Sequence, residues 1–192
     1  MQTGEQKGRS NRVKQAKDGK STARQVALMG LLFALAAVLS FIEGLLPVLP
    51  TLPPGVKLGL SNIVTMFALF FLGKGSGFTL AVLKALFVLF TRGPTAFCMS
   101  LAGGLLSVFV MLLLMQFPSK PHLTLISIFG AIFHNIGQLM ISALVLHSTL
   151  AFGYLPVMVL SGVVMGFLTS LLLKVLKPYL VRMNHIIFNR NI

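Results

Sequence analysis

The amino-acid sequence predicts an all-α membrane protein whose six transmembrane helices form one bundle. Hydrophobic residues make up 56% of the chain and charged residues only 10%, whereas soluble domains carry about 25% charged residues. The apolar residues fall into successive runs of helix length, separated by short polar or proline-rich segments. A chain of 192 residues with this composition is expected to fold as one domain in lipid.

The first apolar run, 22–42, follows a polar and basic segment, 1–21, which we expect to be a disordered cytoplasmic tail. A signal peptide would also begin with basic residues, but 22–42 is long enough to cross a membrane, which takes about 20 residues. We therefore expect a retained helix. Five more spans are predicted, so that 22–176 is the membrane domain and 177–192 a second basic tail; these spans are 58–72, 78–91, 95–116, 123–146 and 155–176.

The basic residues predict the orientation of the bundle in the cell membrane. Eleven of the 16 flank the first and last apolar runs, where such residues are retained in the cytoplasm and attracted to anionic lipid. With both termini inside, Lys74 and Lys120 are also cytoplasmic, and only Lys57 and Arg92 lie outside. The same clustering at membrane boundaries argues against nucleic acid as the partner, despite a net charge of +13.

The longest predicted connection, 44–56, lies between the first two spans. It carries four prolines, which prevent a helix and favour a stiff, extended segment on the outer face: Pro47, Pro50, Pro53 and Pro54.

Ionisable residues near or within the spans are the first candidates for a site. Lys84 stands in the middle of an apolar run, where a charge costs about 2.5–3.5 kcal/mol on insertion scales and usually faces an interior or a cavity. Alternatively, its long stem carries the ammonium to the membrane surface. Lys57, Arg92 and Glu43 fall at the outer rim, where they suit an anionic or zwitterionic solute, or form only an ordinary rim ion pair.

The span 123–146 contains the polar sequence HNIGQ. His134, Asn135 and Gln138 are three or four positions apart in two of their three pairings, so all three can share a broad helix face. Polar groups in lipid need partners, which are either neighbouring helices or a bound molecule. Both interpretations stay open.

Several classes of function are excluded by what the sequence lacks. Only Glu5, Asp18 and Glu43 are acidic, so paired-carboxylate catalysis and carboxylate-bound magnesium have no candidates. The segment 73–76, GKGS, does not fit a nucleotide-binding loop. With one cysteine and four scattered histidines, no metal site is expected, and we predict a protein that is not an enzyme and has no cofactor.

Small residues recur at spacings of four and can let helix backbones approach closely. The pairs Gly103–Ser107 and Gly162–Gly166 are interpreted as packing within the bundle or as contact surfaces. In the first span, Ala23, Ala27 and Gly30 begin at the cytoplasmic end, where a membrane or peripheral partner could dock.

Four stretches carry a family resemblance: ARQVALMGLLFALAAVLSFIE, PGVKLGLSNIVTMFALFFLG, SLAGGLLSVFVM and FHNIGQLM. They resemble the Gx transporter family, also described as heptaprenyl diphosphate synthase component I, which is similar to the substrate-binding S components of energy-coupling factor (ECF) transporters. The resemblance covers about 22–176.

This resemblance implies a six-helix S-component fold with both termini inside. It also implies that a small-residue face of the first helix, here Ala23, Ala27 and Gly30, contacts a coupling subunit driven by two ATPases. The first loop would cover a small-molecule site that includes Lys57 and Asn62. The alternatives are a non-catalytic membrane partner in isoprenoid or quinone metabolism, or an anchor in a quinone- or flavin-linked redox system.

Overall fold

The protein was analysed as a computed structural model that describes residues 2–45, 59–117, 122–146 and 149–188. Six α-helices and one 3₁₀ helix account for nearly all of these residues, and no strand occurs among them. The elements are α1 (Gln2–Leu45), α2 (Asn62–Phe71), α3 (Lys74–Arg92), α4 (Pro94–Gln116), α5 (Leu123–Leu146), η1 (Thr149–Tyr154) and α6 (Leu155–Phe188). The all-α prediction is confirmed.

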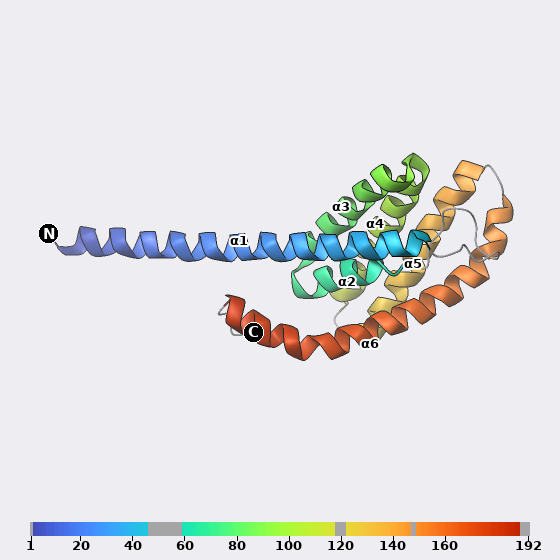
Figure 1. The fold of residues 1–192 in the computed structure, drawn as a ribbon. Coiled ribbons are helices and arrows are strands. Elements are labelled where there is room, and N and C mark those ends of the chain that lie inside the picture. Colours follow the sequence, from blue (N-terminus) through green and yellow to red (C-terminus); the bar gives the residue numbers. More distant parts are fainter. Residues whose placement is uncertain (1, 46–58, 118–121, 147–148, 189–192) are drawn as a thin grey trace.

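The helices form one bundle in which neighbours in sequence pack against each other (Figure 1). Helix α4 packs against α3 and α5, α5 also packs against α6, and α1 packs across α2 and α3. The start of α1 and the end of α6 project from the same side of the bundle (Figure 1). Which side of a membrane this is stays a prediction from the basic residues.

The two long helices differ from the predicted tails. Helix α1 begins at Gln2, so the segment 1–21, which we expected to be disordered, is largely helical in the structure. Helix α6 continues into the predicted basic tail as far as Phe188. Lys, Gln and Arg, which are frequent in 2–21, all have good helix propensity, and the segment contains no proline. The lack of apolar periodicity indicates that nothing packs there, but it does not prevent a solvated helix.

Helix α2 is shorter than the predicted span 58–72. It has ten residues and is therefore only about 15 Å long at 1.5 Å per residue, half the thickness of a bilayer core. The predicted start is wrong because Gly59 has a φ of 92°, which cannot continue a right-handed helix. The other five helices contain apolar stretches long enough to cross a membrane.

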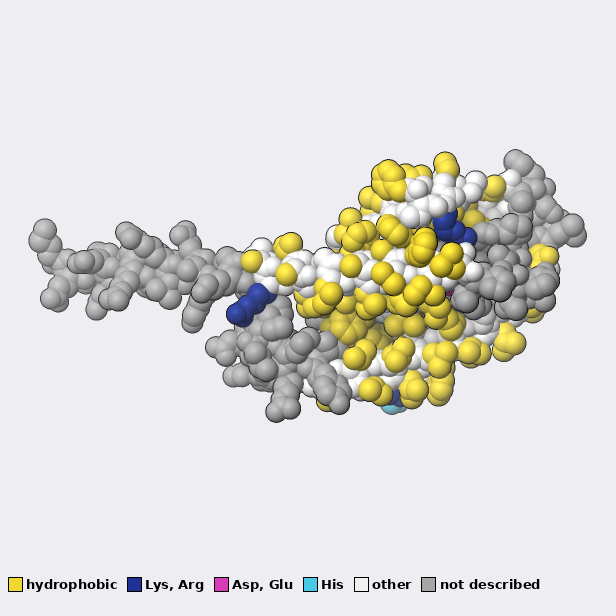
Figure 2. Space-filling view, in the orientation of Figure 1, with side chains coloured by type: hydrophobic (Ala, Val, Ile, Leu, Met, Phe, Trp, Pro, Cys, Tyr) yellow, Lys and Arg dark blue, Asp and Glu magenta, His cyan; other side chains and the backbone are white. Residues whose placement is uncertain are grey.

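The outer surface of the bundle is apolar. Large hydrophobic side chains on α1, α3 and α6 are exposed, including Leu31, Phe90 and Phe167. Figure 2 shows hydrophobic side chains spread over much of the visible face of the bundle. Exposed apolar area on this scale suits lipid as the surrounding solvent. The chain thus has the construction of a multi-pass membrane protein.

The internal small residues bring helix backbones into contact. A Cβ added at Gly137 of α5 would lie 2.8 Å from Gly103 Cα of α4, and one at Gly166 of α6 would lie 2.4 Å from Ile128 Cα of α5. Such contacts are far inside the 3.5–4.0 Å that carbon atoms prefer. The small residues around Gly103 and Gly166 therefore form packing surfaces inside the bundle.

Candidate functional site

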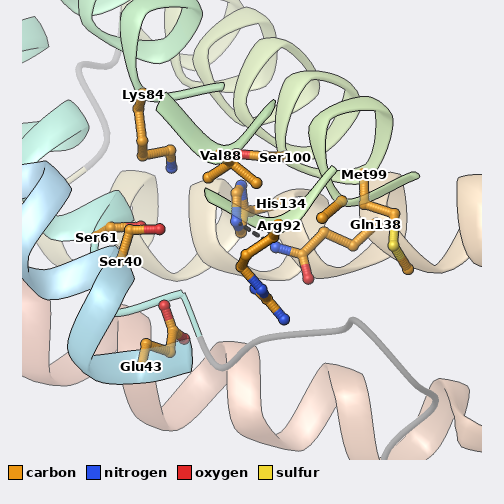
Figure 3. Close-up of a pocket in the computed structure, with 11 residues that line it drawn as sticks. Ser40, Glu43, Ser61, Lys84, Val88, Arg92, Met99, Ser100, His134 and Gln138 are labelled. Atoms are coloured by element: carbon orange, nitrogen blue, oxygen red, sulfur yellow. Dashed lines mark hydrogen bonds between the residues drawn. The ribbon is translucent and has the colours of Figure 1, made fainter. Parts of the chain in front are cut away.

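A cluster of polar side chains lies where α1 and α3 end and α4 begins (Figure 3). Four helices (α1, α3, α4 and α5) and the turn before α2 contribute to it. Six of its eleven lining residues are Glu43 of α1, Ser61 before α2, Lys84 and Arg92 of α3, and His134 and Gln138 of α5. We call these six residues the polar cluster. The predicted candidates Glu43, Lys84, Arg92, His134 and Gln138 are thus brought together, although they are up to 95 positions apart in the sequence.

Glu43 connects the end of α1 to the start of α2. Its Oε1 accepts hydrogen bonds from the backbone N–H of Gly59 and from that of Leu60, the latter at 3.3 Å. The carboxylate therefore provides the hydrogen-bond acceptor for two backbone N–H groups just before α2 that have no partner within a helix. Its second oxygen, Oε2, is buried and has no hydrogen-bond partner among the described residues.

Two cations of α3 face this carboxylate. Lys84 is only 1% exposed, so its ammonium does not reach the membrane surface and the interpretation as a snorkelling lysine is wrong for this conformation. Arg92 is half-buried, two helical turns further along α3. Both are within electrostatic range of Glu43, but neither forms a direct ion pair with it in the described part of the chain. The positions of the three side chains are shown in Figure 3.

On α5, His134 and Gln138 form a neutral hydrogen-bonding pair. Gln138 Nε2 lies 2.7 Å from His134 Nε2, one helical turn away. If the amide nitrogen donates, His134 Nε2 must accept, so the imidazole is neutral with its proton on Nδ1. Both side chains are buried. This side of the cluster can therefore orient a ligand without adding a buried charge.

Asn62 lies next to the cluster at the first position of α2. Its Nδ2 donates to Ser107 Oγ of α4 at 3.3 Å, and its Oδ1 is buried without a partner in the described structure. Asn62 itself does not line the cavity, but Ser61 does. The turn here favours glycine at Gly59, because its φ is 92°, and a Cβ would also lie 3.3 Å from His134 Cδ2.

Asn135 corrects the predicted helix face. Its Nδ2 donates to the Met158 carbonyl and to Ser161 Oγ, both at 2.9 Å, so this side chain joins α5 to α6. One residue is a rotation of about 100° around a helix, which takes Asn135 away from the face of His134 and Gln138. Lys57 lies outside the described residues.

Sequence reasoning missed the hydroxyl and apolar members of the cavity wall. Ser40 lies one turn before Glu43 on α1, and Met99 and Ser100 lie on α4. The spacing of Ser40 and Glu43 could have indicated a shared face, but nothing marked Met99 or Ser100. The free space amounts to about 10 Å³, enough for roughly one water molecule, so a solute requires the walls to separate.

The predicted partner residues on α1 are exposed. Ala23, Ala27 and Gly30 lie on the surface of the helix, and a Cβ at Gly30 would meet nothing within 4 Å. Gly30 also borders a groove of about 590 Å³ between α1 and α3. Among the described residues, no group of three His, Cys, Asp or Glu side chains could hold a metal ion.

The bundle and its buried polar cluster define a multi-pass α-helical membrane protein with an internal polar site at one end. Its fold is similar to that of the S component of a bacterial ECF transporter, with a TM-score of 0.56 and 21% sequence identity over 88% of this chain and 99% of that chain. No curated protein matches the sequence. A model of the heptaprenyl diphosphate synthase component I family matches residues 32–176. The chain belongs to this family, and the S-component-like fold implied by the resemblance is confirmed.

Proposed function

We propose that this protein is the substrate-binding subunit of a membrane transporter and takes up a small anionic or zwitterionic solute through the polar cluster. The observation that carries the proposal is the convergence of Glu43, Lys84, Arg92, His134 and Gln138 on one buried space, in a fold shared with an ECF S component. Buried charged groups are costly unless paired. A cavity that keeps Lys84 buried without a direct ion pair is therefore suited to receive a charged ligand.

The charges of the cluster favour a negatively charged group on the solute. Lys84 and Arg92 outnumber Glu43, while His134 and Gln138 supply neutral hydrogen bonds. Phosphates and carboxylates are the biological anions that lysine and arginine recognise best. A zwitterion would place its anionic group near Lys84 and its cationic group near Glu43 Oε2, which has no hydrogen-bond partner among the described residues.

Energised uptake would need a second protein, and the exposed small-residue face of α1 supports such a contact. Ala23, Ala27 and Gly30 leave room for another helix to approach closely. We propose an ECF-type coupling subunit with its ATPases as the partner. This part of the proposal rests on the S-component fold together with the exposure of that face.

Native mass spectrometry of gently purified protein tests for the solute, because a tightly held small molecule stays bound during gentle ionisation and adds its mass to that of the protein. We expect Lys84→Met to weaken binding of that molecule by about 1.5–3 kcal/mol, the range for a hydrogen bond to a charged group. Lys74→Met is the matched control, since Lys74 is an exposed residue at the first position of the same helix. Equal loss in both variants, or no loss in either, contradicts the proposed site.

The family description supports a second candidate. The protein would then be a non-catalytic membrane partner in heptaprenyl diphosphate metabolism. An active prenyl-chain synthase requires aspartate-rich magnesium motifs, whereas Glu43 is the only acidic residue between 22 and 192. Purification with a prenyl synthase subunit, and without a coupling protein or ATPases, would favour this candidate.

A further inference from the structure

Glu43 is in an unusual position for a residue of an anion-binding site. It is the only acidic residue of the membrane domain, it lines the cavity, and it is buried opposite both cations of α3. A solute anion placed beside Lys84 or Arg92 would therefore be repelled by Glu43 across a space that holds about one water molecule. For a solute that carries no cationic group, this repulsion is relieved if Glu43 moves away as the anion enters.

We infer that Glu43 is a built-in counter-anion: in the empty protein its carboxylate balances the cations of the cluster, and the anionic group of the solute takes its place. This inference rests on the proposed function and adds the mechanism of ligand exchange. The carboxylate uses one oxygen for Gly59 and Leu60, while its other oxygen is buried and has no partner in the part of the chain that the structure describes. Only one of its two oxygens is therefore hydrogen-bonded, which is what we expect of a carboxylate that an incoming anion can displace.

The exchange would have a structural consequence at the start of α2. The N–H groups of Gly59 and Leu60 both donate to Glu43 Oε1, so withdrawal of the carboxylate removes a partner from both. Gly59 also lies next to the His134 ring. A shift of this turn would therefore change the contacts of both Glu43 and His134, on opposite sides of the cavity. Entry of an anion would therefore release the turn at Gly59 and Leu60, just before α2.

Inorganic phosphate is a suitable probe, because it carries the anionic chemistry without requiring that the solute be identified. Glu43→Gln keeps an oxygen that can accept from Gly59 but removes the charge. We expect this variant to bind phosphate at least tenfold more tightly than the wild-type protein, measured by calorimetry in detergent micelles or nanodiscs. Adding Lys84→Met should reverse the gain, whereas adding Lys74→Met should not.

Amide hydrogen exchange at Gly59 and Leu60, resolved by NMR, provides a second test, and its first measurement is made on the wild-type protein. In the wild-type protein, saturating phosphate should accelerate exchange at both amides because the carboxylate leaves. In Glu43→Gln, phosphate should bind with little change at these amides, since the neutral side chain need not move. Unchanged exchange in the wild-type protein when phosphate binds, or equal phosphate affinity in both proteins, overturns the inference.

The inference and the proposed function can fail separately. Suppose that a solute is retained and that Lys84→Met weakens its binding, but that Glu43→Gln does not bind phosphate more tightly and amide exchange does not change. Glu43 is then a fixed part of the site. If phosphate exchanges with Glu43 as expected but no solute is bound or transported, the built-in counter-anion stands and the proposed function falls.

Discussion

Replacing Gly137 with alanine tests a close backbone contact between α4 and α5, the helices that meet at the cluster. The new Cβ would lie 2.8 Å from Gly103 Cα, 2.9 Å from the Ala102 carbonyl oxygen and 3.0 Å from Gly103 N. These atoms are backbone and cannot turn aside, so α5 must move away from α4 by somewhat under 1 Å to restore ordinary contacts. Overpacking of this kind costs about 1–3 kcal/mol.

Alanine also has a higher helix propensity than glycine, which offsets about 1 kcal/mol of this cost. The free energy of unfolding should therefore fall, by an amount between nearly zero and about 2 kcal/mol. We expect a lower unfolding temperature of the purified protein in mild detergent. Gly75→Ala is the matched control, because Gly75 lies in the first turn of α3 and a Cβ there would meet nothing within 4 Å. An unfolding temperature for Gly137→Ala equal to or above that of Gly75→Ala would refute the close contact.

Three further predictions concern orientation, partners and the neutral side of the site. Cysteines introduced at Thr51 and Ser119 in a cysteine-free background should react from outside and inside the cell respectively, and labelling of both from one side would exclude the predicted orientation. Ala23→Leu with Ala27→Leu should reduce recovery of a coupling subunit in pull-downs with the fold unchanged, whereas full recovery would leave this face without a partner role. Gln138→Leu should weaken solute binding by about 1 kcal/mol, the value for a neutral hydrogen bond, and wild-type affinity would exclude it from the site.

The sequence predicted the helices well where apolar length determined them. The span 123–146 agrees with α5 at both ends, and 95–116 differs from α4 by one residue. Prediction failed where local backbone geometry decided, as at Gly59, whose positive φ moves the start of α2 to Asn62. It also failed in 1–21, because hydrophobic patterning detects packing and that part of α1 extends beyond the bundle (Figure 1).

The candidate site was predictable in its members but not in its geometry. A charge such as Lys84 in an apolar run is conspicuous because lipid makes it costly, and Glu43 and Arg92 were found by their places at span ends. Which neighbour each polar residue faces depends on helix rotation, which a single sequence does not fix. Asn135 was therefore grouped with His134, although it binds α6 at Met158.

The residues that let α4 and α5 pack closely also position two members of the polar cluster. A Cβ at Gly103 would lie 2.7 Å from the His134 carbonyl oxygen, 3.0 Å from His134 Nδ1 and 3.0 Å from Gln138 Cγ. The missing side chain of Gly103 is therefore what allows α5 to place the His134–Gln138 pair against α4. Because bilayer lipid provides no hydrophobic force between helices, such backbone contacts must supply much of the packing. The glycines of the bundle thus fix the site, and a substitution there should alter binding and stability together.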